Sequence, residues 1–141
     1  MTRNASAQWA GDLKTGKGLL STASGALSST PYSFKARFEQ GSGTNPEELL
    51  AAAHAGCFTM ALSLILGEVG LRPENLSTTC AITIDKDGEG FSITKSHLAL
   101  TAKVPGASQE AFENAVQKAK NNCPVSKLFD TEITLESKLE Q

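Results

Sequence analysis

Apolar and polar positions in the first third of the chain predict three short strands joined by turns. Two candidate strands, at 6–12 and 17–23, flank the turn LKTGKG. In the third, YSFKARF at 32–38, every second side chain is aromatic or alanine, which is the period of a half-buried strand. Arg37 is expected on the polar face of that strand. Short turns between successive strands predict an antiparallel meander.

A long helix is predicted next, and its first residues carry strong start signals. Asn45 is a good N-cap, Pro46 suits the first helical position, and Glu48 completes a capping box. Acidic residues in the first turn also suit the helix dipole. The helix is expected to run to about Val69 and to end at Gly70.

The middle of this helix is apolar on nearly every face, so we expect it to be buried all round. The stretch 49–66 approaches the length that spans a membrane, but alanines and polar residues such as His54 weaken that interpretation. We interpret it as a core helix. One subunit of 141 residues can hardly cover such a helix, so a partner subunit is expected to pack against it.

The rest of the chain predicts two strands, a helix and a last strand. Strands are expected at 76–85 and 91–104, with the turn KDGEG between them. The apolar positions of the second strand change from odd to even numbers, which predicts a β-bulge near Lys95 and Ser96.

An amphipathic helix with Ser108 as its cap is expected after this pair of strands. Its predicted inner stripe is Ala111, Phe112, Ala115, Val116 and Ala119. Cys123 then precedes a short turn or helix, and 131–139 ends the pattern as a strand. Together these elements predict an α+β fold in a single domain, 1–141.

Composition and charge exclude several classes of protein. The chain has 40% hydrophobic and 20% charged residues and a formal net charge of −2. These values are typical of a globular domain and argue against disorder and nucleic-acid binding. Three cysteines without a CxxC pair, and only two histidines, indicate neither a disulfide scaffold nor a metal site. The N-terminal segment lacks an apolar signal core, so a cytoplasmic protein with reduced thiols is expected.

The three cysteines lie in different local contexts. Cys80 falls on an alternating strand, where a small buried hydrophobe is the simpler interpretation. Cys57 lies in mid-helix after Gly56, a residue that costs about 1 kcal/mol there relative to Ala and so indicates a close approach or a function. Cys123 stands before Pro124 at an expected helix start, which lowers a thiol pKa. Local physics therefore ranks Cys123 as the more acidic thiol.

A redox site built on two thiols needs a cation to hold one of them ionised, and that cation needs an anchor. Arg37 and Glu47 are the candidates, because the capping box uses Glu48 and leaves Glu47 free to point at a guanidinium. The simpler interpretations remain open for both residues: Arg37 as a solvated strand residue, and Glu47 as a first-turn partner of the helix dipole.

Two segments, TNPEELLAAAHAGCFTMAL (44–62) and NCPVSK (122–127), closely resemble the OsmC/Ohr family of cysteine-based peroxidases. The N-terminal WAGDLKTGKG and the segment YSFKARFE are similar to its OsmC branch. The resemblance covers essentially the whole chain, in order and without large gaps.

The resemblance implies roles for four residues. Cys57 matches the peroxidatic cysteine and Cys123 the resolving cysteine. Arg37 matches the arginine that holds the thiolate and the peroxide, and Glu47 the glutamate that orients this arginine. The attacking thiol would then be Cys57, which reverses the local ranking. This is chemically reasonable, since an opposite charge offsets desolvation of a buried thiolate.

The resemblance also implies an architecture and partners. The family fold is an α+β intertwined homodimer, with antiparallel sheets around two long central helices and two active sites at the interface. Members reduce organic hydroperoxides, and in several cases hydrogen peroxide less well, in stress defence. An external dithiol, in related members a lipoyl-bearing protein, reopens the Cys57–Cys123 disulfide. No metal, haem or flavin is used.

Helix geometry adds an expectation about the site. Glu47 and Cys57 are ten residues apart on one predicted helix, which is about 15 Å of rise and roughly 80° of rotation. An antiparallel copy of the helix would bring Glu47 toward the opposite Cys57. A composite site is therefore expected, with Cys57 and Cys123 from one chain and Glu47, with or without Arg37, from the other.

Two other classes of function stay open. A dimeric binding module for a small apolar ligand would use the cysteines only structurally, and Cys57→Ser would leave it intact. A thiol–disulfide oxidoreductase acting on proteins is disfavoured by the lack of CxxC.

Overall fold

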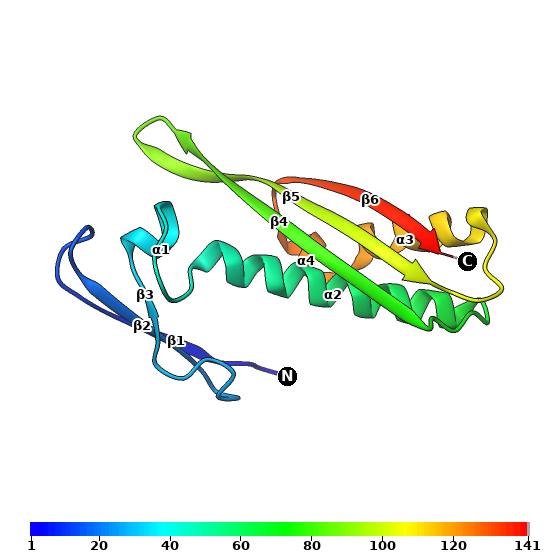
Figure 1. Cartoon of the computed structure of the whole chain (residues 1–141), viewed down its shortest axis with the longest axis horizontal. Helices are drawn as coiled ribbons and strands as arrows, with labels where there is room; N and C mark the ends of the chain where they lie inside the picture. Colours follow the sequence, from blue (N-terminus) through cyan, green and yellow to red (C-terminus); the bar gives the residue numbers. More distant parts are fainter. Residues whose placement is uncertain (141) are drawn as a thin grey trace. The chain divides into compact units, whose positions relative to one another are not determined.

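The computed structural model describes residues 1–140, and its contacts divide the chain into two compact units, Met1–Leu49 and the residues from Leu50 onward. Figure 1 labels the elements. The α+β class is confirmed. A single domain over 1–141 stays a prediction.

The first unit contains a three-stranded antiparallel sheet in the order β1 (Ala5–Ala10), β2 (Lys17–Thr22), β3 (Thr30–Tyr32). This confirms an antiparallel meander of three strands, with the third strand at Thr30–Tyr32 instead of the predicted 32–38. A glycine is required in β2, because a Cβ on Gly18 would lie 2.4 Å from Tyr32 and 2.6 Å from Trp9. The two rings pack with their centroids 5.4 Å apart.

The predicted strand at 32–38 is wrong. β3 ends at Tyr32, and residues Phe34–Phe38 form the short helix α1. Ser33 caps this helix, since its Oγ accepts a hydrogen bond from the Ala36 N–H at 3.2 Å. Phe34 and Phe38 stack at 5.1 Å, which is the i,i+4 contact of a helix. In a segment of seven residues, aromatic side chains four positions apart fit the period of two of a strand and the period of 3.6 of a helix equally well, so the pattern could not distinguish the two.

The long helix α2 spans Pro46–Glu68, close to its predicted bounds. The Asn45 side chain accepts the Glu48 N–H at 2.8 Å, as the capping box requires. The Glu48 carboxylate accepts from the Thr44 hydroxyl at 2.8 Å, so it serves a different partner from the predicted one. The helix ends in a Schellman motif with Gly70 at φ 77°, because the Leu71 N–H donates to the Leu66 carbonyl at 2.9 Å.

The second unit is built on a three-stranded sheet in the order β4 (Asn75–Asp87), β5 (Gly90–Lys103), β6 (Glu132–Glu140). β4 and β5 form the predicted hairpin. Its register shifts where Thr83 pairs with Lys95 but Ile84 pairs with Ile93, so the bulge falls at Thr94, next to the predicted position.

Strand β6 runs parallel to β5, so the expectation of purely antiparallel sheets is wrong for this pair. The helices α3 (Gln109–Asn122) and α4 (Pro124–Leu128) form the connection between the two strands. A crossover of this kind carries the chain back along the sheet, and the next strand therefore runs in the same direction.

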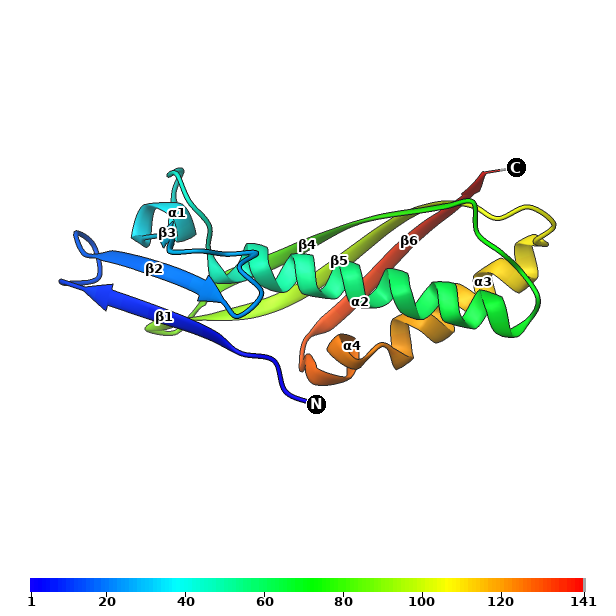
Figure 2. The same cartoon turned by 90° about the horizontal axis from the view of Figure 1, so that it is seen from below.

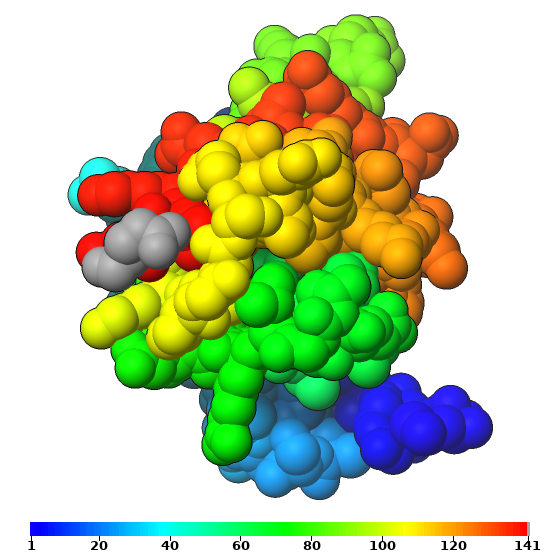
Figure 3. All heavy atoms as spheres, turned by 90° about the vertical axis from the view of Figure 1, so that its right-hand side faces the viewer, coloured from blue at the N-terminus to red at the C-terminus, as the bar shows by residue number. Residues whose placement is uncertain are grey.

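Helices α2, α3 and α4 lie on one face of this sheet (Figures 1 and 2). The predicted stripe of α3 is largely buried, and Ser108 caps the helix as expected. The core joins α2, β5 and α3, and its largest fully buried apolar side chains are Phe58, Leu62, Leu66, Leu98, Val104, Phe112 and Val116. Figure 3 looks onto the end of this unit, where the segment after α2 meets the end of β5. Here the Glu74 N–H donates to the Lys103 carbonyl at 2.8 Å.

The expected burial of α2 on every face is wrong within one chain. Phe58, Leu62 and Leu66 are fully buried, but Met60 is 77% and Leu64 66% exposed. Only 22% of its most apolar 18-residue window is buried, and among the described residues it is the one helix long and apolar enough to cross a membrane. The reason is geometric: one sheet covers only one side of a helix.

Candidate active site

Two of the predicted site residues, Cys57 and Cys123, meet in the second unit as free thiols. Cys57 is half-buried on α2, and Cys123 is fully buried between α3 and α4. Cys123 is the N-cap of α4, because its sulfur accepts the Ser126 N–H at 3.3 Å. The Cys57 thiol hydrogen-bonds to the Cys123 side chain and receives the Val125 N–H. Two cysteines that are 66 positions apart in the sequence therefore interact in the folded chain.

The surroundings of Cys57 favour its neutral form. Burial raises the pKa of Cys57, and the neighbouring Cys123 raises this pKa further, while the Val125 N–H lowers it. In this unit alone, Cys57 is a thiol rather than a thiolate at neutral pH. Ionisation of Cys57 requires a cation that these neighbours do not supply.

Cys57 opens onto a largely apolar pocket of about 760 Å³. Met60 and Leu64 belong to its wall, so the pocket lies on the exposed side of α2. Lys118 and Glu68 are the charged residues of its lining, and Asn122 and Pro124 close it beside Cys123. An alkyl group would find apolar surface next to the Cys57 sulfur.

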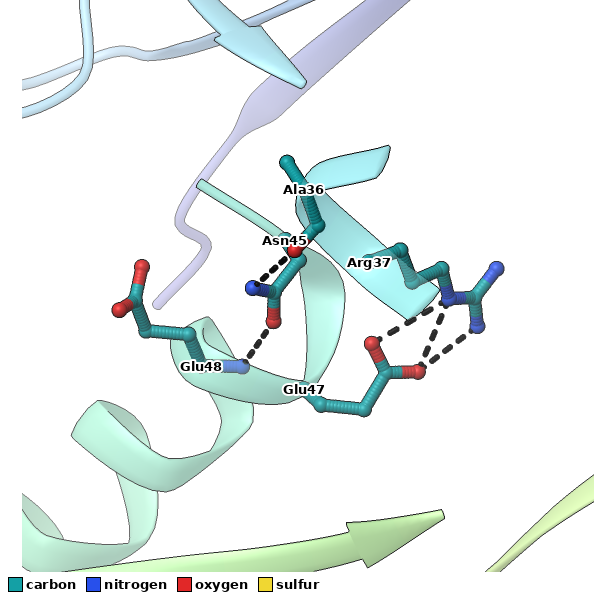
Figure 4. Close-up of polar contacts among 5 residues, drawn as sticks. All are labelled: Ala36, Arg37, Asn45, Glu47 and Glu48. Atoms are coloured by element: carbon teal, nitrogen blue, oxygen red, sulfur yellow. Dashed lines mark hydrogen bonds and ion pairs between the residues drawn. The ribbon is translucent and has the colours of Figure 1, made fainter. Parts of the chain in front are cut away.

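The other two predicted residues, Arg37 and Glu47, form a forked ion pair in the first unit (Figure 4). Arg37 Nε donates to Glu47 Oε1 at 3.0 Å and to Oε2 at 3.2 Å, and Nη2 donates to Oε1 at 2.8 Å. Side-chain exposure is 9% for Glu47 and 39% for Arg37, so the carboxylate is buried beneath a partly accessible guanidinium. Asn45 Nδ2 ties α1 to the start of α2 by donating to the Ala36 carbonyl at 2.9 Å.

Arg37 therefore occupies a helix and not the polar face of a strand. Its guanidinium carbon lies 5.2 Å from the centroid of the Phe38 ring. It also borders a second pocket, of about 270 Å³, whose remaining lining is Trp9, Leu13, Tyr32, Ser33, Phe34 and Phe38. A fixed positive group thus lies beside an aromatic surface.

A buried polar network that the sequence did not predict adjoins Cys123. The His54 side chain is fully buried, with Nδ1 at 2.6 Å from Ser96 Oγ and Nε2 at 2.8 Å from Ser126 Oγ. Ser126 Oγ lies 3.1 Å from Cys123 Sγ. The one sequence feature that points to this network is a histidine on an apolar helix, four residues before Phe58. Its partners lie 42 and 72 positions away in the sequence, so the pattern could not name them.

Cys80 has a polar partner as well. It is half-buried on β4, as its strand pattern predicts, but Ser96 Oγ lies 3.2 Å from its sulfur and His54 Nδ1 3.9 Å from it. The interpretation of Cys80 as a plain hydrophobe was therefore incomplete.

Comparisons with known proteins agree on one family. The model of the family "OsmC-like protein" matches residues 39–138. Peroxiredoxin OsmC of Escherichia coli (strain K12) is 52% identical over 133 residues, covering 94% of this chain and 93% of that protein. Organic hydroperoxide resistance protein-like 1 of Staphylococcus saprophyticus is 40% identical over 86 residues, or 60% of each chain.

Solved structures share the fold. An OsmC-like protein of unknown function from Vibrio cholerae superposes with a TM-score of 0.77 at 18% identity, over 97% of this chain and 99% of that one. The organic hydroperoxide resistance protein OhrB of Bacillus subtilis gives 0.67 at 24% identity, over 97% and 98%. Given the family match over most of its length and the identity to peroxiredoxin OsmC, the chain belongs to the OsmC-like protein family.

Proposed function

We propose that this protein is a thiol-dependent peroxidase that reduces organic hydroperoxides to alcohols, and hydrogen peroxide less well, in oxidative and osmotic stress defence. The observation that carries the proposal is the hydrogen-bonded pair of free thiols, Cys57 and Cys123, beside a largely apolar pocket. The names of the relatives, a peroxiredoxin and organic hydroperoxide resistance proteins, support the same chemistry.

The first step oxidises Cys57. Its thiolate attacks the distal oxygen of the hydroperoxide, the O–O bond breaks, and the alkoxide leaves as the alcohol after taking a proton. Cys57 becomes a sulfenic acid. The apolar pocket wall at Met60 and Leu64 favours an alkyl substituent over bare hydrogen peroxide.

The second step forms a disulfide. Cys123 attacks the sulfenic sulfur, water leaves, and the Cys57–Cys123 bond forms. An external dithiol, such as a lipoyl-bearing protein, then reduces this bond and returns both thiols. The two thiols already interact in the reduced state, which favours this pairing over one with Cys80.

Ionising Cys57 is the role proposed for Arg37. A guanidinium is always charged and can contact a thiolate, a carboxylate and a peroxide oxygen together. Glu47 holds two nitrogens of this guanidinium, which fixes its orientation. Since burial raises the pKa of Cys57, the thiolate depends on this positive charge.

We further propose that the active site is built by a homodimer. The exposed apolar positions of α2, with Met60 and Leu64 among them, would be covered by a second copy of the helix running antiparallel. Arg37 and Glu47 bind each other within one chain and so act as one group. In the dimer this pair serves Cys57 of the other chain.

A stopped-flow experiment tests the peroxidase directly. Reduced protein mixed with one equivalent of cumene hydroperoxide per chain should lose two thiols per chain and form a Cys57–Cys123 disulfide, with Cys80 left free. Mass spectrometry maps the bond. A Cys57–Cys80 disulfide, or unchanged thiols, would overturn the assignment.

A binding module for a small apolar ligand is the alternative, and the apolar pockets are the observation in its favour. Cys57→Ser separates the two functions. It should abolish peroxide consumption in a peroxidase, whereas a binding module would keep its ligand affinity and biological effect.

A further inference from the structure

A continuous chain of hydrogen-bonding side chains crosses the interior of the second unit. It runs from Cys123 through Ser126 to His54, and from His54 through Ser96 to Cys80. Its four links measure 3.1, 2.8, 2.6 and 3.2 Å in that order. His54 and Ser96 are fully buried, and Ser126 is 7% exposed.

The side chains between and at the ends of these hydrogen bonds come from different elements. His54 lies on α2, Ser126 on α4, Ser96 on β5 and Cys80 on β4. Three elements therefore meet the imidazole and hold its plane, and the Phe129 ring packs against its edge at 5.0 Å. A ring held in this way presents Nε2 to Ser126 in a constant direction.

The row of hydrogen-bonded side chains ends in a titratable thiol on each side, Cys123 and Cys80. Within residues 1–140, His54 has hydrogen-bond and ring contacts with two serines, Cys80 and Phe129, and none of these contacts is with a carboxylate or a cationic side chain. Burial lowers the pKa of His54, so the imidazole is neutral at physiological pH. A neutral imidazole has one nitrogen that donates and one that accepts a proton.

We propose that His54, acting through the Ser126 hydroxyl, is the positioning residue that receives the proton of the resolving thiol Cys123 when the disulfide forms. This inference rests on the proposed peroxidase function and concerns only its second step. Ser126 contacts the reacting sulfur, and His54 acts one hydrogen bond further away.

The step balances as follows. The Cys123 S–H proton passes to Ser126 Oγ while the Ser126 proton passes to His54 Nε2. Cys123 sulfur forms a bond to Cys57 sulfur, and the S–O bond of the sulfenic acid breaks. The hydroxide that leaves takes up the proton that His54 received and becomes water, so His54 returns to its neutral form. The sum is one sulfenic acid and one thiol converted into one disulfide and one water.

The contacts with Ser96 and Cys80 explain how His54 keeps Nε2 free to accept a proton. When Nδ1 carries the proton, it donates to Ser96 Oγ, and the Ser96 hydroxyl can donate to Cys80 sulfur. Burial raises the pKa of Cys80, so Cys80 stays a neutral thiol and does not compete for the proton. Its place in the relay is to satisfy Ser96.

A single-turnover experiment separates the two steps. Reduced protein is mixed with cumene hydroperoxide and quenched at intervals. Dimedone then captures the Cys57 sulfenic acid for mass spectrometry, and the disulfide is counted in parallel. The variants are Ser126→Ala, Ser126→Thr and His54→Gln. The matched control is Thr59→Val, which removes the partly buried 2.7 Å hydrogen bond that Thr59, on the same helix, donates to Thr78 and leaves the relay intact.

We expect sulfenic acid formation to stay within about twofold of the wild type in every variant, which also reports that the protein is folded. Disulfide formation should slow at least about tenfold at pH 6.5 in Ser126→Ala and His54→Gln. In both, its rate should rise with pH, because the proton of the attacking thiol then has to leave to base in the solvent. In the wild type, in Thr59→Val and in Ser126→Thr the rate should change little between pH 6 and 8.

Wild-type disulfide rates and a flat pH profile in Ser126→Ala would overturn the relay. A wild-type rate of disulfide formation in His54→Gln would also overturn the relay, because an amide can keep a hydrogen bond but cannot take up the proton. If His54→Gln does not fold, the two Ser126 variants decide the question. Absence of both the sulfenic acid and the disulfide in the wild type would instead contradict the proposed peroxidase function itself.

Discussion

At the scale of single residues, the chemistry depends on what surrounds each thiol. Local sequence ranks Cys123 first because it caps a helix, and the structure shows that cap in the Ser126 N–H bond to its sulfur. Cys57 has a raised pKa because of its burial and its neighbour Cys123. For Cys57 to be the attacking thiolate, it therefore needs an additional positive charge, which Arg37 can provide.

Substituting each thiol in turn tests their order of reaction. Cys57→Ser should consume no peroxide at all. Cys123→Ser should turn over once and leave Cys57 as a sulfenic acid that over-oxidises, since no second thiol traps it. Mass spectrometry of protein treated with one and ten equivalents of cumene hydroperoxide measures both outcomes. If Cys57→Ser still reacted with peroxide and Cys123→Ser did not, Cys123 would be the attacking thiol, as its position at a helix start alone suggests.

Removing the positive charge at Arg37 tests how Cys57 is ionised. Arg37→Gln should slow sulfenic acid formation at pH 7 at least about tenfold, with a rise of about tenfold per pH unit toward alkaline pH. The sign follows from burial, which raises the pKa of Cys57 and leaves it protonated below that pKa. Stopped-flow rates between pH 6 and 9 measure this profile.

The matched control for Arg37→Gln is Lys35→Gln, which removes a positive charge from the same short helix α1 and leaves the Glu47 pair intact. It should behave as the wild type. Equal losses in the two variants would mean that general surface charge, and not the Arg37 guanidinium, ionises Cys57.

At the scale of elements, end signals proved more dependable than periodicity. Helices α2 and α3 begin where Asn45 and Ser108 cap them. The bulge in β5 follows from the change of phase in its apolar positions. The seven-residue alternation at 32–38 gave the wrong element, because a single capping serine and one aromatic pair were enough to form a helical turn.

The cap of α2 predicts a measurable stability effect. Asn45→Ala should lower the free energy of unfolding by about 1 kcal/mol, because the Glu48 N–H loses its acceptor. Asn45→Asp keeps that acceptor but loses the donor to the Ala36 carbonyl, so its loss should be smaller. Urea denaturation of the two variants measures the difference. Equal stabilities of Asn45→Ala and the wild type would contradict the capping role.

At the scale of the whole molecule, one chain leaves its central helix half uncovered. Met60 and Leu64 are mostly exposed on the side of α2 that borders the Cys57 pocket. An apolar face of this kind is typical of a subunit interface. The proposed dimer would cover the helix and bring the Arg37 guanidinium to Cys57.

Mixing inactive variants tests whether the site is shared between chains. Under conditions that exchange subunits, Cys57→Ser and Glu47→Ala should form mixed dimers with one intact site and one site lacking both groups. Peroxidase activity should rise above that of either parent. No gain, with exchange verified by native mass spectrometry, would show that each site is built within one chain.

The control for this experiment mixes Cys57→Ser with Cys123→Ser. Both thiols belong to the same chain in the proposed site, so no mixed dimer contains an intact pair, and multiple-turnover activity should not recover. Recovery here would mean that the disulfide forms between chains.

The sequence by itself determined the α+β order of elements, the start and end of the long helix, the bulge, and the four residues proposed for the site. Capping, turn and alternation signals act within a few residues, so a linear pattern contains them. Local reasoning named the four site residues only as candidates, and their roles came from the family resemblance.

Only the tertiary structure decided the parallel pairing of β6, the single buried face of α2, the fork between Arg37 and Glu47, and the His54 network. Each depends on which segments, distant in sequence, pack together. His54 and Ser126 are 72 positions apart, and only the packing of α2 against α4 brings imidazole and hydroxyl to 2.8 Å. Sequence patterns record the polarity of a side chain, whereas its partner is chosen by the fold.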